Sequence, residues 1–100
     1  MNYVGITSCP TGIAHTYMAA EQLEKTGKKL GHQVKIETQG AMGIENELSQ
    51  KEIDEADAVI FAAELPVIRK ERFDGKKILE VPVQDALKNA TAIFDKVAKL

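Results

Sequence analysis

The stretch that decides the fold runs Tyr3-Val4-Gly5-Ile6-Thr7-Ser8-Cys9-Pro10-Thr11-Gly12-Ile13-Ala14-His15-Thr16. Residues 3–6 are typical of a buried strand, and residues 7–12 have the composition of a turn. A helix is predicted to follow over residues 13–30, because small or apolar residues recur along it at spacings of three and four. That face consists of Thr16, Ala20, Leu23, Gly27 and Leu30. The stretch therefore predicts a strand, a loop and a helix in direct succession.

The remaining sequence alternates short apolar runs with helical patterns. Further strands are predicted over residues 34–37, 58–62 and 77–81, and the second of these is apolar on both faces, as a central parallel strand requires. Residues 39–43 are predicted to form a loop after an edge-type strand. This order is typical of a single four-stranded parallel sheet with helices on both faces, a Rossmann-like three-layer sandwich. In such sheets ligands bind beyond the carboxyl ends of the strands, where Cys9 lies.

Local signals indicate where the helices begin and end. Gly31 suits the C-terminal cap of the helix over residues 13–30. Ser49 and Glu52 have the spacing of a capping box for a short helix that ends at Glu55. Residues 69–73 are expected to form one or two helical turns, and a last helix is predicted over residues 83–99. Its buried face is predicted to contain Ala86, Ala90, Ile93 and Val97, with Leu87 and Phe94 beside them.

Composition indicates one soluble globular domain over residues 1–100. Apolar residues make up 44% and charged residues 28% of the 100 residues. A formal net charge of -2 without a block of like charge gives no support to a nucleic-acid partner. The single cysteine excludes an internal disulfide, and one cysteine with two histidines at these separations does not make a metal site. No signal peptide, membrane span, nucleotide motif or cofactor is expected.

The position of Cys9 suits a nucleophile. The N-terminus of the predicted helix offers backbone N–H groups and a dipole that favour an anion. Gly12 lets the backbone approach that anion, and Thr11 and Thr16 add hydroxyl donors. The same field favours the thiolate of Cys9, which suits in-line attack on phosphorus. The alternative is that Cys9 is a small buried hydrophobic residue, the more common role of a lone cysteine.

The sequence resembles the fructose-type EIIB domain (type 2) of the bacterial sugar phosphotransferase system (PTS). The phosphorylation loop of that family is matched by Cys9-Pro10-Thr11-Gly12-Ile13-Ala14-His15-Thr16. The resemblance continues through Tyr17-Met18-Ala19-Ala20, Glu37-Thr38-Gln39-Gly40, Glu71-Arg72-Phe73 and Asp85-Ala86-Leu87-Lys88-Asn89. It implies a four-stranded parallel sheet and a catalytic Cys9, with Pro10, Thr11, Gly12, Ile13, Ala14, His15 and Thr16 as the phosphate-binding loop.

The resemblance also implies a relay between partners. Cys9 would accept a phosphoryl group from a phosphohistidine of the EIIA phosphoprotein. It would then pass the group to fructose or a related sugar while the EIIC permease imports that sugar. A monomer is expected in the cytoplasm, held at the inner face of the membrane through EIIC. No cofactor enters this chemistry.

Several residues leave alternatives open. His15 is predicted either to face the phosphate or to serve in capping or packing, and His32 is expected on the surface. A basic cluster, formed by Arg69, Lys70, Arg72, Lys76 and Lys77, either docks an acidic partner or is simply a solvated surface. The runner-up function is a low-molecular-weight phosphatase-like hydrolase, whose C-x5-R loop has an arginine where this chain has His15. A third alternative is a binding module with an inert cysteine.

Overall fold

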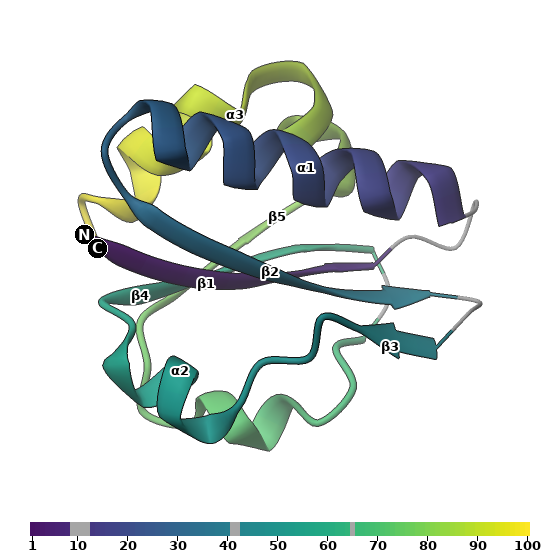
Figure 1. Ribbon diagram of the computed structural model, residues 1–100, viewed down its shortest axis with the longest axis vertical. Coiled ribbons are helices and arrows are strands. Elements are labelled where there is room, and N and C mark those ends of the chain that lie inside the picture. Colours follow the sequence, from purple (N-terminus) through teal and green to yellow (C-terminus); the bar gives the residue numbers. More distant parts are fainter. Residues whose placement is uncertain (9–12, 41–42, 65) are drawn as a thin grey trace.

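The computed structural model, which describes residues 1–8, 13–40, 43–64 and 66–100, has a central sheet between two layers of helices (Figure 1). The strands lie in the order β3-β2-β1-β4-β5. Their bounds are Asn2–Ser8 for β1, Gln33–Gly40 for β2, Gly43–Glu45 for β3, Ala58–Ala63 for β4 and Ile78–Val81 for β5. The pairs β1–β2, β1–β4 and β4–β5 are parallel. The predicted parallel sheet is confirmed for these four strands.

The predicted number of strands was wrong, because β3 adds a fifth. A loop was expected over residues 39–43, but β2 continues to Gly40 and pairs in antiparallel fashion with β3. A strand of three residues is too short to display an apolar alternation in the sequence. Gly43, with a φ of +90°, adopts the left-handed conformation at the start of β3. As a consequence β2 is an inner strand, not the edge strand that the sequence indicated.

Helices cover both faces of the sheet, as predicted (Figure 1). On one face α1 (Ile13–Lys29) packs against α3 (Val83–Val97). On the other face lie α2 (Gln50–Glu55) and the 3₁₀ helix η1 (Lys70–Phe73). The predicted capping box is present: Ser49 Oγ accepts from Glu52 N at 3.1 Å, and Glu52 Oε1 accepts from Ser49 N at 2.9 Å. No helix in the described ranges is long and apolar enough to cross a membrane.

The end of α1 departs from the prediction by one residue. Gly31 has a φ of +88°, and the N–H of His32 donates to the carbonyl of Gly27 at 2.8 Å. This left-handed cap ends the helix at Lys29. Leu30, which was predicted on the buried face, therefore lies outside the helix and is 45% exposed.

Two apolar clusters, one on each side of the sheet, form the core. The cluster under α1 and α3 includes Tyr3, Leu23, Ile36, Ile60 and Phe94. The cluster under α2 and η1 includes Val4, Ile6, Leu48, Phe61 and Phe73. Alternate residues of β1 enter the two clusters, as the strand period of two requires. The predicted buried face of α3 is confirmed at Ala86, Ala90, Ile93 and Val97.

Candidate functional site

The predicted site lies at the carboxyl end of the central strand. β1 ends at Ser8, α1 begins at Ile13, and Ser8 is paired in register with Gln39 of β2 and Ala63 of β4. From β1 the chain passes first to β2 on one side of the sheet and later to β4 on the other side. The order of the strands therefore reverses at β1, and open α/β sheets bind ligands at such a switch point. Cys9, Pro10, Thr11 and Gly12 lie outside the described residues, as do the side chains of Ile13 and Ala14.

The charge pattern of α1 favours an anion at its start. Its first turn, residues 13–16, contains no acidic residue, whereas Lys28 and Lys29 occupy its last turn. The first turn of α1 therefore supplies no carboxylate of its own to the positive end of the helix dipole, whereas ammonium groups match the negative end. His15 lies on the exposed side of the first turn, and Thr16 is buried.

A buried hydroxyl group points to polar chemistry near the start of α1. Thr16 is 2% exposed, and its Oγ1 has no hydrogen-bond partner among the described residues. Thr7 Oγ1, at the end of β1, donates to the carbonyl oxygen of Thr16 at 3.0 Å. Gly40 ends β2 nearby, where an added Cβ would lie 4.0 Å from Thr16 Oγ1. Because an unsatisfied buried hydroxyl costs about 1–3 kcal/mol, Thr16 is a candidate ligand donor.

A buried ion pair lies on the other face of the same sheet end. Arg72 of η1 donates to both carboxylate oxygens of Glu37 on β2, with Nη1 at 2.8 Å from Oε1 and Nη2 at 3.0 Å from Oε2. Glu37 is fully buried and Arg72 is 8% exposed. The carboxylate also accepts from Leu48 N at 2.9 Å and from Gln39 Nε2 at 2.7 Å.

Hydrogen bonding determines the ionisation of this pair. Burial by itself raises the pKa of Glu37, but the hydrogen bonds from Arg72, Gln39 and the backbone of Leu48 outweigh it and leave the pKa below its ordinary value. The hydrogen bond to Glu37 in turn raises the pKa of Arg72. Both side chains are therefore charged at neutral pH.

The basic cluster predicted from the sequence is not one surface. The solvated role expected of Arg72 was wrong, because it is buried on Glu37. Arg69 pairs with Glu47, and Lys70 lies 3.7 Å from Glu80. The buried pair was not predicted from the sequence, although strand β2 contains polar residues and the stretches around Glu37 and Arg72 resemble the family.

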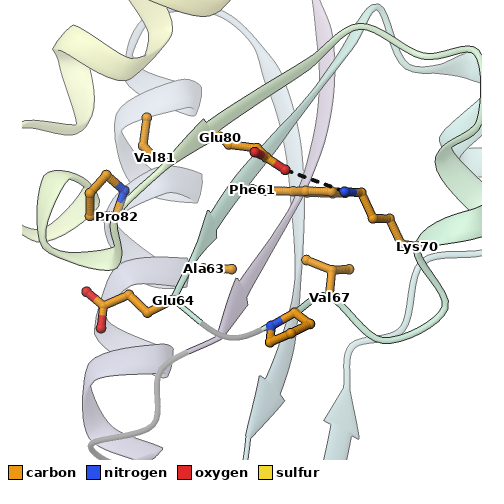
Figure 2. Close-up of a pocket in the computed structure, with 9 residues that line it drawn as sticks. Phe61, Ala63, Glu64, Val67, Lys70, Glu80, Val81 and Pro82 are labelled. Atoms are coloured by element: carbon orange, nitrogen blue, oxygen red, sulfur yellow. Dashed lines mark ion pairs between the residues drawn. The ribbon is translucent and has the colours of Figure 1, made fainter.

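A pocket of about 470 Å³ opens at the carboxyl ends of β4 and β5 (Figure 2). Phe61, Val67 and Val81 supply apolar walls, and the Lys70–Glu80 pair lies at its side. The backbone N–H of Glu64, which also lines the pocket, donates to the carbonyl of Ser8 at 3.1 Å. The pocket thus adjoins the end of β1.

Comparison with known proteins identifies the family. The fold defines an open α/β protein, and the candidate site lies at its switch point, where such proteins bind ligands. The family model described as "PTS system, Lactose/Cellobiose specific IIB subunit" matches residues 4–96. The fructose-specific EIIB component of the PTS system of Haloferax volcanii is 50% identical over 100 residues, covering 100% of this chain and 63% of that protein.

Two further similarities agree with that match. The fructose-like EIIB component 2 of the Escherichia coli PTS system is 48% identical over 94 residues, covering 94% of this chain and 89% of the relative. A crystallised domain of the fructose-specific IIABC component of Borrelia burgdorferi has a TM-score of 0.93 and 39% identity, covering 98% of this chain and 93% of that domain. The chain belongs to the IIB components of the sugar phosphotransferase system.

Proposed function

We propose that this chain carries a phosphoryl group on Cys9 between a phosphohistidine of an EIIA protein and a sugar imported by an EIIC permease. The observation that carries the proposal is the position of the only cysteine, directly after the central strand and four residues before the start of α1. Family membership supports the phosphotransferase role. The names of the relatives favour fructose or a related sugar as acceptor.

The chemistry consists of two displacements at phosphorus. In the first, the Cys9 thiolate attacks, an S–P bond forms and the N–P bond of the phosphohistidine breaks with its electron pair returning to the imidazole. In the second, a sugar hydroxyl attacks, an O–P bond forms and the thiolate leaves. The hydroxyl proton passes to a base of the acceptor protein. Both steps require positioning and charge stabilisation rather than a cofactor.

Residues 10–16 are proposed to hold the phosphoryl oxygens. The positive end of α1 supplies the field, and the buried Thr16 hydroxyl is a donor for one oxygen. His15, on the exposed side of the first turn, is proposed to face the incoming donor. The protein would act as a monomer beside the membrane component, because each step needs only one cysteine.

A mass measurement tests the carrier role. Wild type and the Cys9→Ser variant are incubated with a phosphorylated EIIA-type protein and analysed by intact mass. We expect one phosphoryl group on wild type and none on Cys9→Ser. A label that persists in the variant, or that maps to His15, contradicts the proposal.

Alkylation kinetics test the electrostatic argument. The rate of iodoacetamide reaction against pH reports the pKa of the Cys9 thiol. We expect a midpoint below about 8.5, the value of a free thiol, because the start of α1 favours the thiolate. A midpoint at or above that value indicates a buried structural cysteine.

Turnover of p-nitrophenyl phosphate separates the carrier from the phosphatase alternative. This chain has His15 where the phosphatase loop has arginine, and it contains no Asp-Pro sequence for a general acid. We expect negligible nitrophenol release beside fast exchange with a phosphohistidine donor. Sustained turnover of roughly 1 per second or faster, as in ordinary enzymes, favours the hydrolase.

A further inference from the structure

We propose that Thr7 is a positioning residue for phosphoryl transfer, which acts by holding Thr16 at the start of α1. The inference rests on the proposed function, because Thr16 is proposed there to donate to a phosphoryl oxygen. Thr7 is fully buried near the end of β1, two residues before Cys9 in the sequence. Thr16 is the fourth residue of α1 and therefore belongs to the first turn of that helix.

A buried hydrogen bond joins the two residues. Thr7 Oγ1 donates to the carbonyl oxygen of Thr16 at 3.0 Å. A carbonyl oxygen has two lone pairs, so it can accept this bond in addition to the bond that it accepts within a helix. Thr7 pairs in register with Thr38 of β2 and with Ala62 of β4, so strands on both sides determine its position. The bond therefore fixes the first turn of α1 relative to the sheet.

The start of α1 depends on this bond more than the rest of the helix does. Further along α1, Ala19, Ala20 and Leu23 pack into the apolar core. The described side chains of the first turn belong to His15, which is exposed, and to Thr16, which is buried. A hydrogen bond is directional, whereas apolar burial is not, so the bond from Thr7 determines the position of this turn more narrowly than apolar packing would.

The side chain of Thr16 is left free to bind a ligand. Among the described residues, its Oγ1 is the one buried side-chain oxygen or nitrogen without a hydrogen-bond partner. Valine would fill nearly the same volume without an unsatisfied polar group, so this hydroxyl does not serve the stability of the fold. Outside its own chain neighbours, the nearest described atom to a Cβ added at Gly40 would be Thr16 Oγ1, at 4.0 Å. The missing side chain of Gly40 thus leaves space beside the hydroxyl.

The polar side chains on the other face of the sheet show the contrast. Gln39 Oε1 accepts from Ile68 N at 2.8 Å, and Gln39 Nε2 donates to Ile68 O at 3.1 Å. Arg72 donates to the carbonyls of Arg69 at 3.0 Å and Ile68 at 3.3 Å. These side chains spend their hydrogen bonds on the backbone of residues 68 and 69. In Thr16 the backbone is held and the hydroxyl is not, as expected of a positioned ligand donor.

The test measures the rate of Cys9 phosphorylation by rapid quenching and intact mass, over a range of concentrations of a phosphorylated EIIA-type protein. Thr7→Val keeps the shape of the side chain but removes the donor. We expect it to lower the saturated rate about tenfold with the KM for the donor unchanged, because a small misplacement of a binding group slows the transfer step. Thr7→Ser retains the hydroxyl and is expected to restore most of the rate.

The matched control is Thr38→Val. Thr38 is a buried neighbour of Thr7 in the register of β1 and β2, and its side chain makes no hydrogen bond among the described residues. The control is expected to keep the wild-type rate. A loss in Thr38→Val equal to that in Thr7→Val would show a general packing effect and overturn the proposal.

Thr16→Val tests whether Thr7 acts through Thr16. We expect a saturated rate about 100-fold lower, as when one donor to a transferring group is removed, with no fall in the midpoint of urea unfolding. The double variant Thr7→Val/Thr16→Val is expected to be no slower than Thr16→Val alone. A wild type without phosphorylation overturns the proposed function itself. A full rate in Thr7→Val or Thr16→Val, no recovery in Thr7→Ser, or losses that multiply in the double variant overturn the positioning role while the carrier role stands.

Discussion

The two faces of the sheet are held by different kinds of interaction. Under α1 and α3 the contact is apolar, and it is covered by helical segments of 17 and 15 residues, the second of which is kinked at Asn89. Under α2 and η1 the helical segments have 6 and 4 residues, and the buried Glu37–Arg72 pair lies among the apolar side chains. Long helices are positioned by their apolar stripe, whereas short segments and loops need specific polar contacts. The first face therefore positions the start of α1, and the second positions residues 66–72.

The largest effect is expected from breaking the ion pair. Arg72→Met leaves the carboxylate of Glu37 buried without its cation, which costs about 3–5 kcal/mol of unfolding free energy. The double variant Glu37→Leu/Arg72→Met removes both charges and is expected to recover at least half of that loss. Urea unfolding measures the free energies of unfolding of both variants, which are compared at equal m values. A double variant as unstable as Arg72→Met shows that the pair acts chiefly through its backbone contacts.

The apolar face is also the part of the fold that the sequence predicted well. Apolar repeats long enough to recognise occur in four strands, β1, β2, β4 and β5, and in the two helices α1 and α3. The errors are the last residue of α1 and the short pairing of β3 with β2, whereas the caps at Gly31 and Ser49 were predicted. Leu30 continues the apolar repeat, but the Gly31 cap ends the helix before it. β3 consists of three residues whose pairing with β2 no periodicity predicts.

The Glu37–Arg72 pair on the polar face could not be predicted from the sequence for a different reason. Glu37 and Arg72 are 35 residues apart in sequence, so only the folded chain shows that they meet. A charged residue is exposed by default, and the sequence alone placed Arg72 among surface cations. Cys9, in contrast, was found from its local context of strand, turn and helix. Its role stays a prediction until phosphorylation is measured.

A second prediction concerns the close approach on the apolar face. At Gly27 an added Cβ would lie 2.3 Å from Val34 Cγ2 and 2.9 Å from Phe94 Cζ. We expect Gly27→Ala to lower the unfolding free energy by about 1–3 kcal/mol through overpacking, despite the gain of about 1 kcal/mol from alanine in a helix. Thermal unfolding measures the loss, and Gly27→Ala/Val34→Ala is expected to relieve part of it. A more stable Gly27→Ala protein contradicts this packing.

The third prediction is that the stability of the polar face depends on pH more strongly than that of the apolar face. Because the pKa of Glu37 is lowered on folding, its contribution is present above the ordinary value of 4.5 and is lost as pH falls through the folded value. Urea midpoints between pH 7 and pH 3 are expected to fall less in Glu37→Leu/Arg72→Met than in wild type. Gly27→Ala, on the apolar face, serves as control and is expected to keep the wild-type pH dependence. If the urea midpoints of wild type and the double variant fall equally with pH, the lowered pKa of Glu37 does not contribute to stability, and the prediction is contradicted.

The smallest effect is expected at the start of α2, where the polar face depends on a cap. Six residues are too few for a stable helix without support, and Ser49 Oγ accepts from Glu52 N while Glu52 also binds Lys35 at 2.9 Å. Ser49→Ala is expected to cost about 1 kcal/mol, whereas Ser49→Gly, which keeps a favourable cap residue, costs only a few tenths. In a domain of this size 1 kcal/mol lowers the midpoint of thermal unfolding by about 4–8 °C. Equal midpoints for Ser49→Ala and wild type would contradict this prediction. They would mean that Ile53 and its apolar neighbours stabilise α2 without the cap, and that the Glu37–Arg72 pair is the main polar contribution to this face.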